Sequence, residues 1–493
     1  MKKTYFFIIV SLVVAINPLS AQDFQSYKRQ QQEAFQTYRQ KTQDEWDAYR
    51  KKVNEEFAEF LGRPWEKKTA EKPESVPDKV PDIPPVVLPK IDTDIPMDNP
   101  IDVDINFPKL DAKPTPIAPV AYKPKPAEKG IAFTFYGTPG KVRFDMGKKA
   151  SLKGADEKAV SRFWKDLSGS AYDNIVADCQ NIRYDRDLCD WAYLMMTRKV
   201  AEAIYGSRNE SVAFHAWLMS QSGFSVRLGR ENGTLHLLVQ TSALLFGKQY
   251  WAMKEGNFFL FDDERVSAMH VMAASFPNTS PLRMRMNVRN DFETSATPAR
   301  NLSSEQYPDV KVSVGCNKNM LAFLKDMPTP AQEGGDEPDF MMYAQMPLSD
   351  IAAHEIYSKL MNQVIGKSEA EGANILLNFV QTAFQYKTDG DAWGYERAFF
   401  PEETLYYPYS DCEDRAILFC YLVRNLMGLD VAFVSYPGHL ASAVHFTENV
   451  SGDYFVVSGK KYVVCDPTYI NASIGLTMPG MENKTAQVFL MEP

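Results

Sequence analysis

The sequence predicts a mixed α/β (α+β) fold in which two similar modules follow an N-terminal helical arm and a proline-rich linker. Three observations support this prediction. Aromatic residues recur every eleven positions near the N-terminus, prolines crowd the stretch that follows, and residues 207–226 resemble residues 412–431. Both of these similar passages run from helical spacing through a glycine into a strand, which is typical of a repeated unit of helix and sheet.

The first 21 residues have the composition of a leader. Two lysines precede an apolar run that ends in Leu-Ser-Ala, which is typical of a secretory signal peptide cleaved after Ala21. We therefore expect an exported protein, periplasmic or extracellular. No later apolar run approaches the length of a membrane span, so we expect no integral membrane span. The net charge of −9 and the lack of a basic stripe argue against a nucleic-acid partner.

Residues 22–66 are predicted to form an amphipathic helical arm. Their aromatic side chains fall into two series with an eleven-residue spacing, Phe24, Phe35, Trp46 and Phe57, and Tyr27, Tyr38, Tyr49 and Phe60. That period keeps a narrow stripe on one face of a nearly straight helix. Because such a helix cannot bury its stripe alone, we expect self-association or docking through this arm. The alternative is a solvated arm whose aromatic residues pack on the body of the protein.

Residues 67–129 are predicted to be a linker, because fourteen prolines fall between Pro73 and Pro126. This composition favours an extended spacer over a packed core. The remaining chain divides into a first module over 130–279, a β connector over 280–350 and a second module over 351–493.

Cys412 is the candidate nucleophile of the second module. It opens a stretch of helical apolar spacing that ends at Gly428, and Ser410 and Glu413 match a capping box. A thiol in the first turn of a helix meets free N–H groups and the helix dipole, which lower its pKa. The acidic neighbours of Cys412 act in the opposite direction, so a nearby imidazolium is also needed. The alternative is an inert core cysteine, which is how we interpret Cys420.

His439 and Asp466 follow Cys412 in the order that a thiol triad requires. His439 begins a strand whose alternation places it on one face with Ala441 and Ala443, and Asp466 ends the next apolar strand. There a carboxylate could orient the imidazole. His445, on the same face of the strand, is the competing base.

These residues resemble the transglutaminase-like superfamily of papain-type thiol enzymes. The matching motifs are DCEDRA, the Gly-His pair before small and apolar residues, and CDPTY. The D-C-x-D form resembles the bacterial transglutaminase-like cysteine peptidases in particular. The resemblance implies a nucleophilic Cys412, a general base His439 and an orienting Asp466 that act on an amide carbonyl. Glu413 departs from the familiar aromatic residue after the nucleophile, and Leu440-Ala441 departs from the usual Ala-Trp after the histidine.

The expected function is therefore acyl transfer or hydrolysis at peptide or isopeptide bonds, with a protein or peptide as substrate. The alternative is a non-catalytic binding or scaffold protein that reuses the same fold. The backbone N–H of Cys412 is the expected oxyanion donor, and its second partner stays open among Trp393, Tyr406, Tyr407 and Tyr409.

The first module is predicted to be a degenerate copy. The register of the repeat places Ser207, Thr234 and Asp262 where the second module has Cys412, His439 and Asp466. His236 lies two positions beyond Thr234 and could replace the missing base. A histidine that is satisfied within its strand is the alternative.

The six cysteines and six histidines give little sign of a cofactor. No Cys/His cluster has the spacing of a metal site, and no phosphate-binding glycine motif is present, so we expect no cofactor and no metal. In an exported protein disulfides are possible, and Cys179 and Cys189 are the one plausible local pair.

Overall fold

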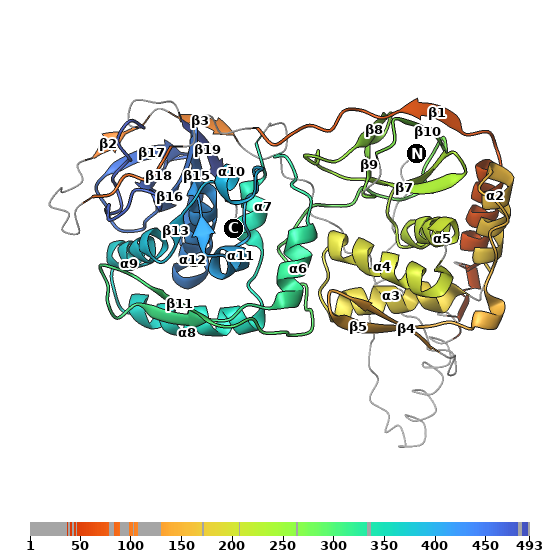
Figure 1. Ribbon diagram of the computed structural model, residues 1–493, viewed down its shortest axis with the longest axis horizontal. Helices are drawn as coiled ribbons and strands as arrows, with labels where there is room; N and C mark the ends of the chain where they lie inside the picture. The colour runs from red at the N-terminus through yellow and green to blue at the C-terminus, as the bar shows by residue number, and fades with distance from the viewer. Residues whose placement is uncertain are drawn as a thin grey trace, which may run out of the picture. The chain divides into compact units, whose positions relative to one another are not determined.

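The computed structural model describes residues 37, 40–41, 44–45, 47–77, 83–88, 98–101, 103–106, 130–169, 172–206, 208–262, 265–332, 337–481 and 486–491 (Figure 1). Two compact units make up the chain, residues 1–57 and residues 58–493. In the first unit, residues 47–57 are helical, and helix continues to Leu61 in the second. The predicted signal peptide and Ser207 lie outside the described residues, as do residues 22–36, 38–39, 42–43 and 46 of the predicted arm.

The second unit begins with a six-stranded sheet in the order β1-β10-β6-β7-β9-β8, which we call the N-terminal sheet. Its strands are β1 (Glu66–Thr69), β6 (Val226–Glu231), β7 (Thr234–Gln240), β8 (Tyr250–Met253), β9 (Gly256–Leu260) and β10 (Ala268–Val271). Helix α5 packs on β6 and β7. The elements that precede or accompany it are the hairpin β4 (Gly130–Phe135) and β5 (Thr138–Arg143), η1 (Met146–Lys148), α2 (Glu157–Leu167), α3 (Asp173–Asp185), α4 (Asp190–Tyr205) and α5 (Arg208–Gln221).

The segment 280–350, predicted as a β connector, holds helices as well as strands. It contains the hairpin β11 (Arg300–Ser303) and β12 (Lys311–Val314), then α6 (Lys318–Asp326) and α7 (Phe340–Gln345). Asn317 caps α6 through its side chain, and Asp339 caps α7 in the same way. Both residues are strong N-cap formers, so the helices have a local cause in the sequence.

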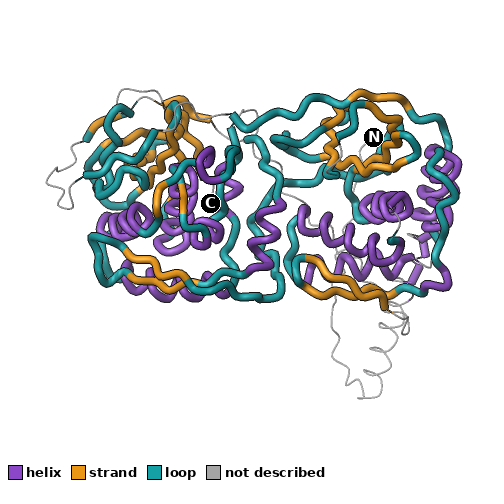
Figure 2. The backbone as a smooth tube through the Cα atoms, in the orientation of Figure 1, coloured by secondary structure: helices purple, strands orange, loops and turns teal. Residues whose placement is uncertain are grey.

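The C-terminal sheet has seven strands in the order β2-β17-β18-β16-β15-β19-β3. Its strands are β2 (Asn99–Pro100), β3 (Val103–Asn106), β15 (Asp430–Tyr436), β16 (His439–His445), β17 (Asp453–Val457), β18 (Lys460–Cys465) and β19 (Ala486–Leu490). The accompanying elements are α8 (Asp350–Val364), α9 (Glu369–Thr382), β13 (Gln385–Tyr386), α10 (Asp389–Ala392), α11 (Pro401–Tyr406), β14 (Tyr409–Ser410) and α12 (Cys412–Met427). Figure 2 shows strands and helices side by side in this part of the chain, and α12 packs on β15 and β16. The mixed α/β fold class predicted from the sequence is therefore confirmed.

The described part of the predicted linker joins both sheets. β1 pairs with β10 in the N-terminal sheet, whereas β2 and β3 pair in parallel with β17 and β19 in the C-terminal sheet. Sheet edges present unpaired N–H and C=O groups, so an extended chain that passes close to them is captured as an additional strand. These described residues are paired with the sheets and do not form a free spacer.

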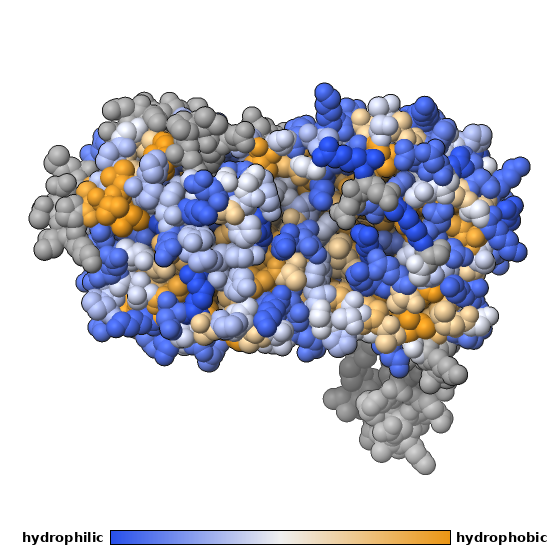
Figure 3. All heavy atoms as spheres, in the orientation of Figure 1, coloured by the Kyte–Doolittle hydropathy of each residue, from blue (hydrophilic) through white to orange (hydrophobic). Residues whose placement is uncertain are grey.

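Throughout the part of the chain that the structure describes, every helix is too short or too polar to span a bilayer, as the sequence predicted. The face drawn in Figure 3 is largely hydrophilic, and its apolar residues form separate patches.

All six cysteines are buried, free thiols. Cys179 and Cys189 are not bridged, although they were the one plausible local pair. Burial raises the pKa of the Cys189 thiol to about 12 and also raises the pKa of Cys179, which is the behaviour of inert core cysteines.

Candidate active site

Helix α12 places Cys412 at its first residue. Asp411 is the N-cap, and the capping box joins Asp411 to Asp414, one residue later than the predicted pair of Ser410 and Glu413. The prediction was wrong because Ser410 is held in β14, which pairs in parallel with β13. An extended, paired residue cannot also start the helix, so the N-cap moves to the next residue.

The Cys412 side chain is fully buried, and its thiol donates a hydrogen bond to Glu413 Oε2 at 3.2 Å. As the first helical residue, Cys412 has its backbone N–H among the groups that no helical carbonyl can accept. An anion at this position therefore meets backbone donors and the positive end of the helix dipole.

The connection from α12 to β16 brings His439 to the same end of the module as Cys412. The 16 residues of α12 rise about 24 Å, and the 7 residues of β15 return about 23 Å in the opposite direction. A two-residue turn then starts β16, and Tyr436 pairs with His439 across the hairpin. His439 thus lies near the level of the helix start.

His439 and Asp466 form a buried pair. His439 Nε2 lies 2.8 Å from Asp466 Oδ2, and both side chains are at most 1% exposed. The other carboxylate oxygen accepts hydrogen bonds from the backbone N–H groups of Thr468 and Tyr469, at 2.9 and 3.2 Å. The carboxylate is therefore fixed in position and engages one ring nitrogen of His439.

The second ring nitrogen, His439 Nδ1, is buried and has no hydrogen-bond partner among the described residues. A buried nitrogen without a partner costs free energy, which is typical of a group reserved for a reacting atom. His445 differs, because its Nδ1 lies 2.9 Å from the backbone oxygen of Lys461 at the far end of β16. The geometry therefore favours His439 over His445 as the base.

A cavity of about 440 Å³ opens beside this pair. Its wall includes His439, its neighbours Gly438 and Leu440, and Glu413 from the first turn of α12. Among the described residues it is Glu413, the neighbour of Cys412, that reaches this wall. Cys412 is fully buried and does not belong to this wall. The structure thus joins His439 to Asp466 by a hydrogen bond and leaves the thiol covered.

Gln381 is a buried residue whose role near Asp466 could not be inferred from the sequence. Its Nε2 donates to the backbone oxygens of Asp466, Tyr469 and Ala472 at 3.1, 2.7 and 3.1 Å, and its Oε1 accepts from the N–H of Asn471 at 3.1 Å. One side chain on α9 therefore holds the loop that carries Asp466.

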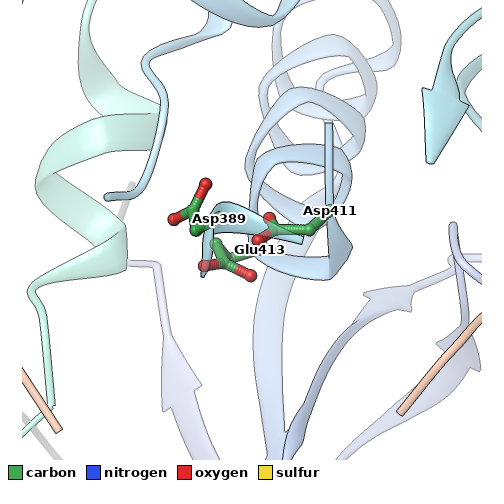
Figure 4. Close-up of side chains that lie close together, drawn as sticks. All are labelled: Asp389, Asp411 and Glu413. Atoms are coloured by element: carbon green, nitrogen blue, oxygen red, sulfur yellow. The ribbon is translucent and has the colours of Figure 1, made fainter. Parts of the chain in front are cut away.

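Three buried carboxylates meet around the start of α12. Asp389, Asp411 and Glu413 each offer an oxygen, and these oxygens lie within 4.8 Å of one another (Figure 4). Asp411 Oδ1 has no hydrogen-bond partner among the described residues. The spacing of Cys and His residues in the sequence gives no sign of this group, because it contains carboxylates alone. Such oxygens could hold a hard cation such as Ca²⁺ or Mg²⁺.

Burial and mutual repulsion disfavour the charged form of this cluster. Burial, followed by the charges of Asp414 and Glu413, raises the pKa of Asp389 to about 9. Burial and the same two neighbours raise the pKa of Asp411 well above its ordinary value. At neutral pH the cluster must therefore hold protons or a cation.

Replacing Asp389 by asparagine should stabilise the protein most at alkaline pH. Because the folded-state pKa is raised, Asp389 favours folding fully only below the unfolded pKa of about 3.9, and this contribution is lost as pH rises toward 9. Thermal unfolding in EDTA should show the gain in Tm of Asp389→Asn growing from pH 5 to pH 9. The exposed Asp391, replaced in the same way, should give no such trend, and equal gains for both variants at every pH would contradict this account.

A cation bound in the cluster would make the wild type more stable than Asp389→Asn. Adding Ca²⁺ or Mg²⁺ should then raise the Tm of the wild type more than that of Asp389→Asn, because the variant has lost one ligand oxygen. Equal shifts for the two proteins would show that these three carboxylates hold no cation.

The aromatic loop before Cys412 surrounds an arginine. Arg397 forms an ion pair with the buried Glu403 and lies 5.2 Å from the ring centroids of both Trp393 and Phe399. Trp393 also makes an edge contact with Tyr407, 5.0 Å between ring centroids. Of the proposed oxyanion partners, Tyr406 and Tyr409 are exposed. Trp393 and Tyr407 therefore help to build the loop, and none of the four is singled out as a donor.

The N-terminal sheet carries a second pair of histidine and aspartate. His236 Nδ1 lies 3.3 Å from Asp262 Oδ2, and Asp262 also faces Arg208 at 3.5 Å and Arg198 at 3.8 Å. The ladder of β7 and β9 explains the pairing, since Leu238 is opposite Leu260 and two further steps bring position 236 opposite 262. The sequence register placed Thr234 at the position of the base. The imidazole that contacts Asp262 belongs to His236, two residues further along the strand.

Comparisons with known proteins do not assign the chain to a family. No protein-family model matches this chain, and no curated protein matches it.

Proposed function

We propose that this protein is an exported thiol enzyme of the transglutaminase-like superfamily that acts on peptide or isopeptide bonds through Cys412, His439 and Asp466. One observation carries the proposal: His439 is hydrogen-bonded to Asp466 through Nε2, while its buried Nδ1 has no partner among the described residues at the end of the sheet where α12 begins. A base that is oriented on one side and open on the other is what a thiol nucleophile requires.

In the proposed reaction, the Cys412 thiol gives its proton to His439 Nδ1, and the thiolate attacks an amide carbonyl. The imidazolium then protonates the departing amine as the C–N bond breaks, which leaves an acyl thioester on Cys412. Water or a second amine, deprotonated by His439, resolves the thioester and restores the thiol. Asp466 holds the imidazole in position and stabilises the imidazolium throughout.

The start of α12 supplies the electrostatic part of the mechanism. The backbone N–H of Cys412 lies in the first turn of α12, at the positive end of the helix dipole, and can donate to the oxyanion that forms on the carbonyl. Whichever carboxylate of the cluster remains ionised opposes a negative thiolate, so proton transfer to His439 is needed for the nucleophile to form at neutral pH.

The first module fits the role of a degenerate copy. The order of helix, glycine, antiparallel hairpin and acid-bearing strand end occurs both at α5 to Asp262 and at α12 to Asp466. His236 and Asp262 keep an imidazole beside a carboxylate, but the position of the nucleophile is serine. A tandem arrangement with one active and one structural module accounts for this combination.

The cavity favours an extended peptide that is neutral or basic. Its wall includes the carboxylates of Glu337, Glu396 and Glu413 beside a single arginine, Arg397, which is already ion-paired to Glu403. Peptides rich in Asp or Glu should therefore be poor substrates.

Trapping of the acyl-enzyme tests the proposal. Incubation with a mixture of basic and neutral peptides, acid quench and mass spectrometry should show an acyl adduct on the fragment that contains Cys412. Cys412→Ala should lose the adduct and nearly all turnover, whereas Ser211→Ala, on α5 of the first module, should retain both. A fully folded protein that never acquires an acyl group would favour the alternative, a binding or scaffold protein that reuses the fold.

A further inference from the structure

The segment that follows β1 leaves the N-terminal sheet as an extended chain held by its backbone. Ala70 donates to the carbonyl of Ser267 at 2.9 Å and Glu71 to the carbonyl of Tyr250 at 2.8 Å. The carbonyl of Glu74 then accepts from Gly247 N–H at 2.7 Å. The chain is therefore anchored up to residue 74.

The next residues reach the candidate active site. Val76 and Pro77 belong to the wall of the 440 Å³ cavity that also contains His439 and Glu413. Val76 is half-buried, whereas residues 71–75 are exposed. An extended, proline-containing segment thus places Val76 and Pro77 on the wall of the cavity, where a substrate would have to enter.

The described chain is anchored again beyond the cavity, beside Asp466. Ile470 donates to the carbonyl of Val86 at 2.8 Å, and Leu88 donates to the carbonyl of Ile470 at 2.9 Å. Asn471 Nδ2 adds a bond of 3.0 Å to the carbonyl of Leu88. Ile83, Val86 and Leu88 also pack against the core of the C-terminal sheet. This second anchor lies four and five residues after Asp466, on the loop that Gln381 holds.

The site between these anchors is closed. Cys412 is 0% exposed and His439 is 2% exposed, so no acyl group can reach the thiol in this conformation. A thiol enzyme must open a path to its nucleophile, and Val76 and Pro77 are a part of this wall that a short displacement of the chain would remove.

We propose that Glu74–Pro77 is an intramolecular strap that occupies the substrate entrance and keeps the thiol inaccessible until the strap is displaced. The strap also indicates the substrate class: an extended peptide with an aliphatic residue followed by proline. Its consequence for turnover rests on the proposed function, but its occupancy of the entrance does not. Because the strap is tethered at both ends, its effective concentration at the entrance is of millimolar order, so a free peptide must compete with it.

The strap predicts selective exposure of Cys412 in the full-length Val76→Asp variant. The new carboxylate would face Glu337, Glu396 and Glu413 across the cavity and be repelled from it. The readout is iodoacetamide alkylation at pH 9.5, where an ordinary thiol with a pKa of about 8.5 is ionised and access limits the rate. Alkylation of Cys412 should be at least ten-fold faster in Val76→Asp than in wild type. Pro73→Asp, outside the cavity wall, should stay within two-fold.

Peptide mapping separates strap release from unfolding, because the other five cysteines are buried and should stay protected. If Val76→Asp exposes all six thiols, the milder Val76→Gly replaces it and must accelerate Cys412 alone. Cys412 labelling that matches wild type in folded variants would overturn the proposal. This test of the strap does not depend on catalysis. Adding His439→Ala to Val76→Asp should leave the faster alkylation of Cys412 at pH 9.5 unchanged.

Discussion

Replacing His439 by alanine is expected to lower turnover of a peptide substrate by about 10²–10⁴-fold, the usual contribution of a positioned acid and base. The imidazole of His439 is oriented by the 2.8 Å contact to Asp466, and its Nδ1 is the ring nitrogen without a partner among the described residues. In the proposed mechanism, alanine removes the group that takes the thiol proton and later protonates the leaving amine. The fall should appear in kcat and in kcat/KM together.

His445→Ala is the matched control on the same strand. Its imidazole is half-buried and bonds to the carbonyl of Lys461, so its loss should change turnover by only a few-fold. If His445→Ala abolished turnover and His439→Ala spared it, the competing base would be correct and the proposed triad wrong.

Replacing Gln381 by alanine is expected to be strongly destabilising. The change removes the side-chain donor of the Ala472 carbonyl and the acceptor of the Asn471 N–H. The carbonyls of Asp466 and Tyr469 also lose this donor but keep backbone bonds of 3.3 and 3.1 Å. Unsatisfied buried groups cost about 1–3 kcal/mol each, and partial relaxation should leave a loss of roughly 2–4 kcal/mol in the free energy of unfolding. Urea unfolding measures this loss.

Gln385→Ala provides the comparison, because Gln385 is an exposed glutamine four residues along the chain. It should change the free energy of unfolding by less than about 0.5 kcal/mol. Equal losses for the two variants would show that the loop after Asp466 does not depend on Gln381.

The order and local setting of the candidate triad could be predicted from the sequence because each signal is short-range. The apolar spacing after Cys412 and Gly428 predicted α12, and Gly428 does end the helix with a φ of 69°. Alternation predicted the strand that begins at His439, and Ala441 and Ala443 do share one buried face. Such periodicities depend only on neighbours within a few residues.

The features that the sequence did not reveal depend on contacts between distant segments. Asp389 lies 22 positions before Asp411 and is brought to it by a loop in which its carboxylate accepts a hydrogen bond from Arg397 N–H. Helix α12 begins one residue later than predicted because Ser410, in β14, pairs with Tyr386 of β13, a contact made across 24 positions. The strand pairing of the proline-rich segment likewise depends on sheet edges that form hundreds of residues later.

The pH dependence of Cys412 alkylation tests the central claim most directly. The claim is that His439 activates this thiol. The test uses the folded Val76→Gly variant, in which the strap is displaced, and measures its reaction with iodoacetamide across a range of pH. Cys412 should react well below the pH of about 8.5 at which an ordinary thiol ionises. Adding His439→Ala to this variant should move the profile back to that of an unfolded control peptide. A profile that matches the control peptide with His439 in place would contradict the account.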